Sequence, residues 1–516
     1  MSAKGKSMDM YLMEVFKQFV TLKDSDLKKS QEVFKNVFEQ VKQKMGEQCN
    51  YFKKFATQVM YAGSVYDGIK VSKLDEFDMD IVIRLPISYE DGEDGITLEN
   101  EKPGFVKMKI TRPFDNLDKQ PDWEAVNKVT RDWRDEEKYF LQSKFRHWIH
   151  GIVQKALNEM DGRVDVNGVL YLIKYKTSGP AYTLNVRSAS EGDDFTLDVD
   201  LVPVIRFMKP RWPKGYRSMN GSVAKEWLVV PKPNRCLPEG RQRDRCWRLS
   251  FQDFERELMR GCQQLKNTIR LVKKLRDALG LKAIASYYIK TLFLWKIEKT
   301  DKKYWETKIS VTFKSMVQEL HDAIVAKNIP YFWHEENNLI ESLKPTHQKL
   351  YVEKLKAVLK SIEANDVDKV VSFLLNPEEL KEFKASPFYL SQVSVTSVSS
   401  SCSTGTTVSR QQSVTSTSCT AEDSNSQSLA NLLALVTNLT EKIDILTDKV
   451  VMLEEKVAKL EMEKKIEKNS NVDLQNIAFG VNSISLTAET DHEKEDSCNN
   501  VPILVSSETQ MDLLTF

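Results

Sequence analysis

The sequence contains no long uninterrupted hydrophobic run. Its 516 residues are 41% hydrophobic, yet no apolar stretch approaches the roughly 20 residues that a membrane-spanning helix needs. Residues 1–6 are polar and small and lack the apolar core of a signal peptide. We therefore expect a cytoplasmic protein without membrane contact, long enough to bury one large or two medium cores.

Paired cysteines are also missing. The seven cysteines are scattered, and none is spaced as Cys-x-x-Cys. An odd, scattered set argues against both a disulfide framework and a zinc ribbon.

The net charge is small as well, at +1, but the acidic and basic residues are unevenly distributed along the chain. From residue 470 onward eight acidic residues accompany one lysine, which leaves +8 on residues 1–469. A basic body permits a polyanionic partner without establishing one.

The stretch with the clearest chemical meaning begins at Gly63-Ser64 and continues with acids that alternate with apolar residues, Glu76, Asp78 and Asp80. Side chains alternate between the two faces of an extended strand, so the three acids share one face and the residues between them face a core. A row of acids beside a turn of small residues can hold divalent metal and phosphate. Periodicity alone leaves the three acids equivalent.

A second acidic pair, Asp198 and Asp200, lies inside the apolar run 195–205. Burying an ionised carboxylate is costly unless it is paired or binds metal, so these acids require an explanation. Either they contribute to a metal site or they face solvent on an edge strand.

The order of periodic segments indicates an α+β protein. Apolar residues recur at helical spacing over residues 9–48, strand-like runs and one helix alternate between about residues 61 and 207, and the second half of the body is nearly all helical. Lysines along the first helical segment, among them Lys42 and Lys44, form either a solvated face or a polyanion-binding face.

The C-terminal part has a different composition. Residues 385–428 are rich in Ser and Thr and predict a disordered linker. Residues 429–468 carry five heptads with Val, Ile or Leu at one apolar position and Leu at the other. That pattern favours a parallel two-stranded coiled coil, and hence a homodimer, over a helix that folds back on the body.

Gly-Ser, a short spacer, two acids on a strand and a third acid on a later strand form the layout that a nucleotidyltransferase requires. Three carboxylates can hold two Mg²⁺ or Mn²⁺ ions that activate an attacking hydroxyl and neutralise the departing pyrophosphate. The turn lets backbone amides and the Ser64 hydroxyl approach triphosphate oxygens.

These residues resemble the cyclic GMP-AMP synthase and its animal synthase-like receptors. The resemblance covers about residues 10–345 and rests on four motifs in the family's order: Gly63-Ser64-Val65-Tyr66 with the triplet Glu76-Phe77-Asp78, the run around Asp200, WRLSF at 247–251 and SYYIKT at 286–291. It implies a bilobal enzyme, with a mixed α/β catalytic lobe and a helical second lobe, in which Glu76, Asp78 and Asp200 are the metal ligands.

The resemblance also implies nucleotide-binding roles. Asp80 and Asp198 then look like additional acids. Ser64 looks like a triphosphate contact, as do Lys273, Ser286 and Lys290; Arg248, Ser250 and Glu255 look like base contacts; and Tyr287 looks like the aromatic that stacks on a base.

One departure from the family concerns the activating ligand. The DNA-sensing member carries a zinc thumb after the WRLSF strand, whereas residues 251–273 here run through without one. The chain is similar instead to zinc-free insect-type receptors, some of which respond to double-stranded RNA, a ligand read by shape and phosphates. The candidate contacts are Lys42, Lys44, Lys53, Lys54, Arg256, Arg260 and Arg270.

The expected domains are a helical lead-in at 1–55, a catalytic lobe at 56–245, a helical lobe at 246–384, the linker at 385–428, the coiled coil at 429–468 and an acidic tail at 469–516. The expected function is a ligand-activated synthase that joins ATP and GTP into a cyclic dinucleotide for innate immune signalling. A transferase with a linear product and a catalytically inactive dimeric scaffold are the alternatives.

Overall fold

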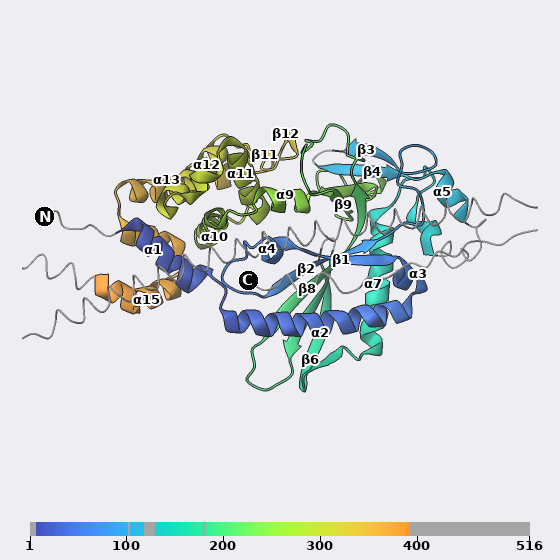
Figure 1. The fold of residues 1–516 in the computed structure, drawn as a ribbon, viewed down its shortest axis with the longest axis horizontal. Helices are drawn as coiled ribbons and strands as arrows, with labels where there is room; N and C mark the ends of the chain where they lie inside the picture. The colour runs from blue at the N-terminus through green and yellow to red at the C-terminus, as the bar shows by residue number, and fades with distance from the viewer. Residues whose placement is uncertain (1–6, 102–103, 118–128, 179–180, 393–516) are drawn as a thin grey trace, which may run out of the picture. The chain divides into compact units, whose positions relative to one another are not determined.

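The computed structural model describes residues 7–101, 104–117, 129–178 and 181–392. Along the chain, N-terminal helices precede a large mixed sheet, and a set of helices follows it (Figure 1). This order is the one that the apolar periodicity predicts. The expected coiled coil at 429–468, the tail at 469–516 and most of the linker lie outside the described residues.

The N-terminal segment is helical. It comprises α1 (Met8–Val15), the π-helical turn η1 (Phe16–Val20), α2 (Asp24–Gln48) and α3 (Asn50–Phe55).

The sheet has ten strands and branches at its longest strand. The strands are β1 (Ala56–Ala62), β2 (Glu76–Ile83), β3 (Thr97–Glu101), β4 (Phe105–Lys109), β5 (Arg163–Val166), β6 (Val169–Ser178), β7 (Ala181–Ser188), β8 (Thr196–Met208), β9 (Glu226–Val230) and β10 (Cys246–Ser250). The main order is β3-β4-β10-β9-β8-β7-β6-β5, and β2 pairs in parallel with β8 and antiparallel with β1.

The core lies between the sheet and two helices, α2 and α7 (Gln142–Glu159), which pack against each other. Figure 1 shows α2 running along the sheet. Phe77 of β2 is 2% exposed and stacks on Phe34 of α2 with ring centroids 4.2 Å apart. The apolar residues between the acids of β2 therefore face the core, as alternation predicts, and the acids lie on the opposite face.

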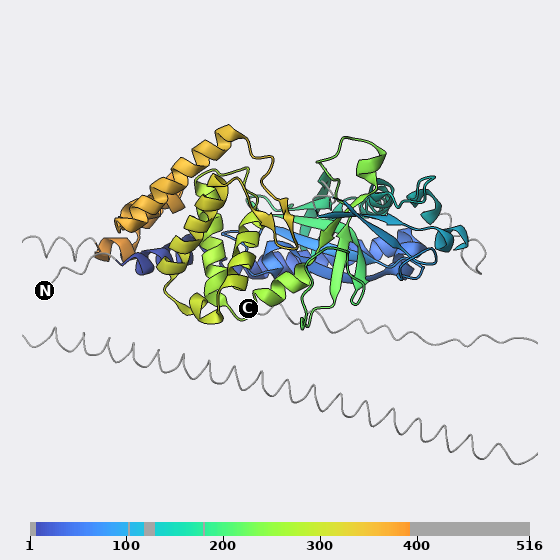
Figure 2. The ribbon, with the colours of Figure 1, turned by 90° about the horizontal axis from the view of Figure 1, so that it is seen from above.

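Helices dominate after the sheet. They are α9 (Gln252–Leu258), α10 (Gln263–Ala278), α11 (Ser286–Lys299), η4 (Lys302–Glu306), α12 (Ile309–Val325), α13 (Pro345–Glu363), α14 (Val367–Leu374) and α15 (Pro377–Ala385). Shorter helical turns elsewhere are α4 (Gly63–Tyr66), α5 (Arg112–Asp115), η3 (Arg131–Trp133) and α8 (Arg241–Asp244). α1 packs against α12 and α14, whereas α2 packs against the sheet, so the N-terminal helices contact both parts of the body (Figure 2).

Three details differ from the sequence-based picture. First, β10, at the start of the expected helical lobe, pairs with β9 and β4 and so belongs to the sheet. Second, a hairpin of β11 (Pro330–Tyr331) and β12 (His334–Asn338) interrupts the helices. Third, the chain is still helical at 387–392, inside the expected linker, because Phe388 packs edge-on against Tyr11 with ring centroids 5.2 Å apart.

None of the described helices is both long enough and apolar enough to cross a membrane. The four described cysteines, Cys49, Cys236, Cys246 and Cys262, are free thiols.

Candidate active site

The turn at Gly63 requires glycine for two reasons. Its φ of +72° lies in the left-handed region, and an added Cβ would stand 1.7 Å from Oδ2 of Asp78. The turn is thus pressed against β2 at one of the expected ligands. Ser64 follows in α4, where its carbonyl accepts a hydrogen bond from the amide of Ile69 (2.9 Å).

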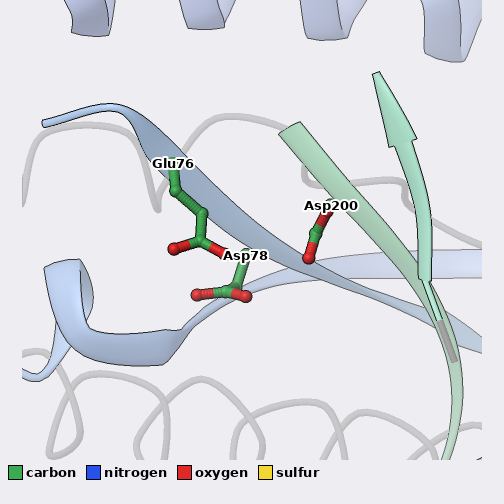
Figure 3. Close-up of side chains that lie close together, drawn as sticks. All are labelled: Glu76, Asp78 and Asp200. Carbon is green, nitrogen blue, oxygen red and sulfur yellow. The ribbon is translucent and has the colours of Figure 1, made fainter. Parts of the chain in front are cut away.

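Three carboxylates converge beside this turn. The parallel pairing of β2 with β8 sets Asp78 directly opposite Asp200, and Glu76 lies two residues earlier on the same face. One carboxylate oxygen from each residue lies within 4.8 Å of the others, and Figure 3 shows the three side chains pointing toward one another. The sheet register therefore brings together the three acids that the resemblance selects.

The electrostatics of this cluster favour a cation. Burial, followed by the nearby charges of Glu76 and Asp200, raises the pKa of Asp78 to about 6. The pKa of Asp200 is also raised, chiefly by burial, although the Thr183 hydroxyl donates to its Oδ1 at 2.5 Å. Three oxygen donors that repel one another fit a hard divalent cation, which would relieve both the repulsion and the burial cost.

The other two acids on this face have different surroundings. Asp80 is 6% exposed and accepts a hydrogen bond from Gln252 (3.2 Å), and burial raises its pKa to about 7. Asp198 accepts hydrogen bonds from Asn185 (2.6 Å) and Lys176 (3.0 Å). Both lie beside the converging carboxylates and bind other partners.

One of the expected phosphate contacts, Lys273, bonds the loop that follows this turn. The ammonium of Lys273 donates to the carbonyl of Ile69 (2.7 Å), the residue whose amide bonds Ser64. Burial, followed by the charges of Arg276 and Lys70, lowers the pKa of Lys273 to about 8. Ser286, at the start of α11, accepts a hydrogen bond from Arg276 (2.8 Å).

Lys70 was not singled out from the sequence. Its ammonium lies 2.9 Å from Oδ1 of Asp75 and 3.3 Å from Oε2 of Glu76. A lysine in a loop between two motifs gives no periodic signal, and only the folded loop brings it to the carboxylates.

The expected base contacts come from β10, α9 and α11. Arg248 and Ser250 share one face of β10, and the Arg248 guanidinium lies 5.1 Å from the ring centroid of Tyr331. Tyr287 donates a hydrogen bond to Oε1 of Glu255 (2.8 Å), and Lys290 forms an ion pair with Oε2 of the same carboxylate (2.8 Å). Glu255 and Lys290 are buried, and both are bonded within the protein.

The expected nucleic-acid contacts fall into two groups. Lys42, Lys44, Lys53 and Lys54 lie on the consecutive helices α2 and α3, and Arg260 is exposed after α9. The other two face inward: Arg256 pairs with the buried Asp67 (3.0 Å), and the Arg270 guanidinium lies 5.8 Å from the centroid of the Phe16 ring, with burial lowering its pKa. Lys53, Lys54 and Arg260 are thus the exposed members of this set, whereas Lys42 and Lys44 are half-buried and Lys44 pairs with Glu47 and Glu159.

Comparison with known proteins assigns the fold. Residues 65–261 match the Mab-21 protein nucleotidyltransferase domain, and residues 264–357 match the Mab-21 protein HhH/H2TH-like domain. A cyclic GMP-AMP synthase-like receptor of Ctenocephalides felis is 32% identical over 399 residues, covering 73% of this chain and 90% of the relative. One of Trichogramma pretiosum is 34% identical over 381 residues, covering 71% and 76%. Together with the converging acids, these matches establish that the chain belongs to the Mab-21 nucleotidyltransferases, in the family of cyclic GMP-AMP synthase-like receptors.

Proposed function

We propose that this chain is a cytoplasmic, ligand-activated nucleotidyltransferase that joins ATP and GTP into a cyclic dinucleotide for innate immune signalling. The observation that carries the proposal is the convergence of Glu76, Asp78 and Asp200 beside the Gly63-Ser64 turn. The similarity to cyclic GMP-AMP synthase-like receptors supports the product class.

Glu76, Asp78 and Asp200 are the residues that would hold Mg²⁺ or Mn²⁺. Such ions, when bound, supply Lewis-acid activation of the attacking hydroxyl and neutralise charge on the departing pyrophosphate. The position of the carboxylates sets the position of the metal ions. It is fixed by the sheet, because Asp78 and Asp200 are directly paired residues of two parallel strands.

The protein's own groups would bind and orient the nucleotides. Ser64 and Lys273 both bond the backbone of Ile69, and we expect the Ser64 hydroxyl and the Lys273 ammonium to hold triphosphate oxygens. The ring of Tyr287 offers a stacking surface for a base, and Arg248 and Ser250 offer hydrogen-bond donors from one face of β10. Holding both reactants in one geometry lowers the entropic part of the reaction barrier.

The test is an analysis of products. Full-length protein is incubated with ATP, GTP and Mg²⁺ or Mn²⁺, with and without double-stranded RNA, and the mixture is treated with phosphatase before chromatography. We expect a phosphatase-resistant dinucleotide from the parent and from Glu191→Gln, a control at an exposed acid, and no product from Glu76→Gln.

Other products would point to the alternatives. A phosphatase-sensitive ladder of linear products would identify a linear transferase. No product from the parent under any ligand, with Glu76→Gln behaving identically, would leave the inactive scaffold and refute the proposed reaction.

We further propose that double-stranded RNA is the activator and that it contacts the lysines of α2 and α3. Duplex RNA is recognised mainly through phosphates and 2′-hydroxyls, which suits exposed lysines on a helical surface. The double variant Lys53→Glu/Lys54→Glu should weaken RNA binding. It should also lower the salt dependence: the slope of log K against log salt concentration should fall by about one unit per lost phosphate contact.

The matched control is Lys302→Glu/Lys303→Glu, which makes the same charge change at exposed residues of η4. Equal losses of RNA binding in both double variants would show a non-specific charge effect and refute the assignment of this surface.

A further inference from the structure

Four charged side chains form a largely buried cluster next to the turn that carries Ser64. Asp67, just after α4, receives a hydrogen bond from the Lys290 ammonium at 2.6 Å and another from Nε of Arg256 at 3.0 Å. Lys290 also lies 2.8 Å from Oε2 of Glu255. The side-chain exposures are 8% for Asp67, 15% for Arg256, 6% for Lys290 and 5% for Glu255.

The cluster extends to the aromatic residue expected to stack on a base. The second oxygen of Glu255, Oε1, accepts hydrogen bonds from the hydroxyl of Tyr287 (2.8 Å) and from Nε1 of Trp333 (2.9 Å). Trp333 lies in the turn of the β11–β12 hairpin and is fully buried. The Tyr287 side chain is thus fixed at its outer end by a carboxylate that two other residues, Lys290 and Trp333, hold in place.

Asp67 and Lys290 keep their charges near neutral pH. Burial alone would raise the pKa of Asp67, but Lys290 and Arg256 outweigh it, so its pKa is lowered. For Lys290 burial opposes the charge, yet Asp67 and Glu255 raise its pKa. Two anions and two cations therefore compensate one another.

Stability is a weak explanation for such a cluster. Buried ion pairs seldom stabilise a fold more than apolar residues of similar volume do, and their best-attested use is to fix one arrangement of elements. Here the cluster joins the turn after Ser64 to α9 and α11, the helices that carry Glu255 and Tyr287. It therefore sets the spacing between the expected phosphate contact and the expected base contact.

The resemblance assigns Lys290 to the triphosphate and Glu255 to a base, but Lys290 is paired with the carboxylates of both Asp67 and Glu255. Lys273 is equally buried but donates to a backbone carbonyl, so it stays the expected phosphate contact. We propose instead that Asp67, Glu255 and Lys290 are positioning residues that hold the Ser64 turn and the Tyr287 ring at the spacing a bound nucleotide requires. This inference rests on the proposed nucleotide site and concerns how that site is built.

The two roles differ in their dependence on the number of phosphates. A side chain that contacts the triphosphate loses more affinity for ATP than for ADP or AMP when it is replaced, whereas a positioning residue weakens all three by the same factor. The dissociation constants of AMP, ADP and ATP are therefore measured calorimetrically with Mg²⁺ for full-length parent, Lys290→Met and Lys273→Met. Lys273→Met is the phosphate-contact comparison.

We expect Lys290→Met to weaken the three nucleotides equally, by about tenfold. Lys273→Met should weaken ATP by at least about tenfold while leaving AMP within twofold. Selective loss of ATP in Lys290→Met would show a triphosphate contact and overturn the proposal. Unchanged dissociation constants with a lowered melting temperature would show a purely structural role and also overturn it.

Two further variants keep the test decisive if Lys290→Met does not fold. Tyr287→Phe removes only the hydroxyl that bonds Glu255, so the ring stays but loses its fixed orientation; we expect a uniform loss of about three- to fivefold for the three nucleotides. Asp67→Asn should cause a similar uniform loss, and combining it with Tyr287→Phe should add little, because both act through one network. Full affinity in Tyr287→Phe, or additive losses in the double variant, would refute the network.

Binding is measured without turnover, so its result is separate from that of the product assay. A parent that binds nucleotides with the expected variant pattern but makes no dinucleotide would uphold the positioning role and refute the proposed reaction. A parent that binds none of the nucleotides would refute both.

Discussion

Replacing Asp78 with Asn should stabilise the metal-free protein at neutral pH and abolish its response to metal. A carboxylate oxygen of Asp78 lies within 4.8 Å of oxygens of Glu76 and Asp200. Without a cation, the negative charges of these two residues repel the ionised form of Asp78. Asparagine has nearly the same shape and no charge. The variant therefore separates the repulsion from the packing.

The magnitude follows from the shifted ionisation. The pKa of Asp78 is raised from 3.8 to about 6, first by burial and then by Glu76 and Asp200. As pH rises from about 4, the unfolded carboxyl ionises while the folded one stays protonated, so stability falls with pH and reaches its lower level above about pH 6. One pKa unit corresponds to 1.36 kcal/mol, so at pH 7.5 Asn should recover at most about 3 kcal/mol.

The assay is urea unfolding in EDTA at several values between pH 4.5 and 7.5, repeated with Mn²⁺. The advantage of Asp78→Asn should grow as pH rises from about 4 to about 6 and stay constant above. Ligand at 100 times its dissociation constant adds about 2.7 kcal/mol to a protein that binds it, and we expect this gain in the parent and in Glu191→Gln but not in Asp78→Asn. A variant less stable than the parent in EDTA at pH 7.5, or equally stabilised by Mn²⁺, would refute the interpretation of the site.

Three other perturbations test the surroundings of the site. Gly63→Ala places a Cβ 1.7 Å from Oδ2 of Asp78 at a positive φ. Product formation should therefore fall by about 100-fold, and the free energy of unfolding in urea should fall by about 1–3 kcal/mol. Activity within twofold of the parent would contradict this. Phe77→Ala removes a ring stacked on Phe34 and should cost about 3–5 kcal/mol in the same measurement. Truncation after Ser428 should convert a dimer to a monomer in light scattering if the heptads at 429–468 pair, and an unchanged mass would contradict that prediction.

Sequence periodicity was sufficient to predict the main helices and strands because each of them has one buried face. The alternation around Phe77 and the heptad-like spacing around Phe34 correctly predicted which side of each element is apolar, and the two residues stack in the core. The hairpin at 330–338 gave no comparable signal. Its two strands are short and its buried residues, such as Trp333, lie in the turn.

The buried ion cluster marks the limit of sequence reasoning. Asp67, Glu255 and Lys290 are far apart in the chain, and no local pattern shows that three charged residues will meet in a dry environment. The motif resemblance placed two of them at a nucleotide, which accounts for their chemistry but not for their burial. Only the packing of α9 and α11 against the turn after α4 reveals the contacts among them.

The choice among the acids of β2 illustrates why pairing adds what periodicity lacks. Alternation treats Glu76, Asp78 and Asp80 alike, but Asp78 is paired with Asp200 of β8, whereas Asp80 is paired with Val202. A third carboxylate is therefore available at one end of the row only, and at the other end Asp80 is buried beside Gln252. The metal site is defined by the register between two strands more than 100 residues apart in sequence, so Asp80→Asn should leave Mn²⁺ binding intact while Asp78→Asn removes it.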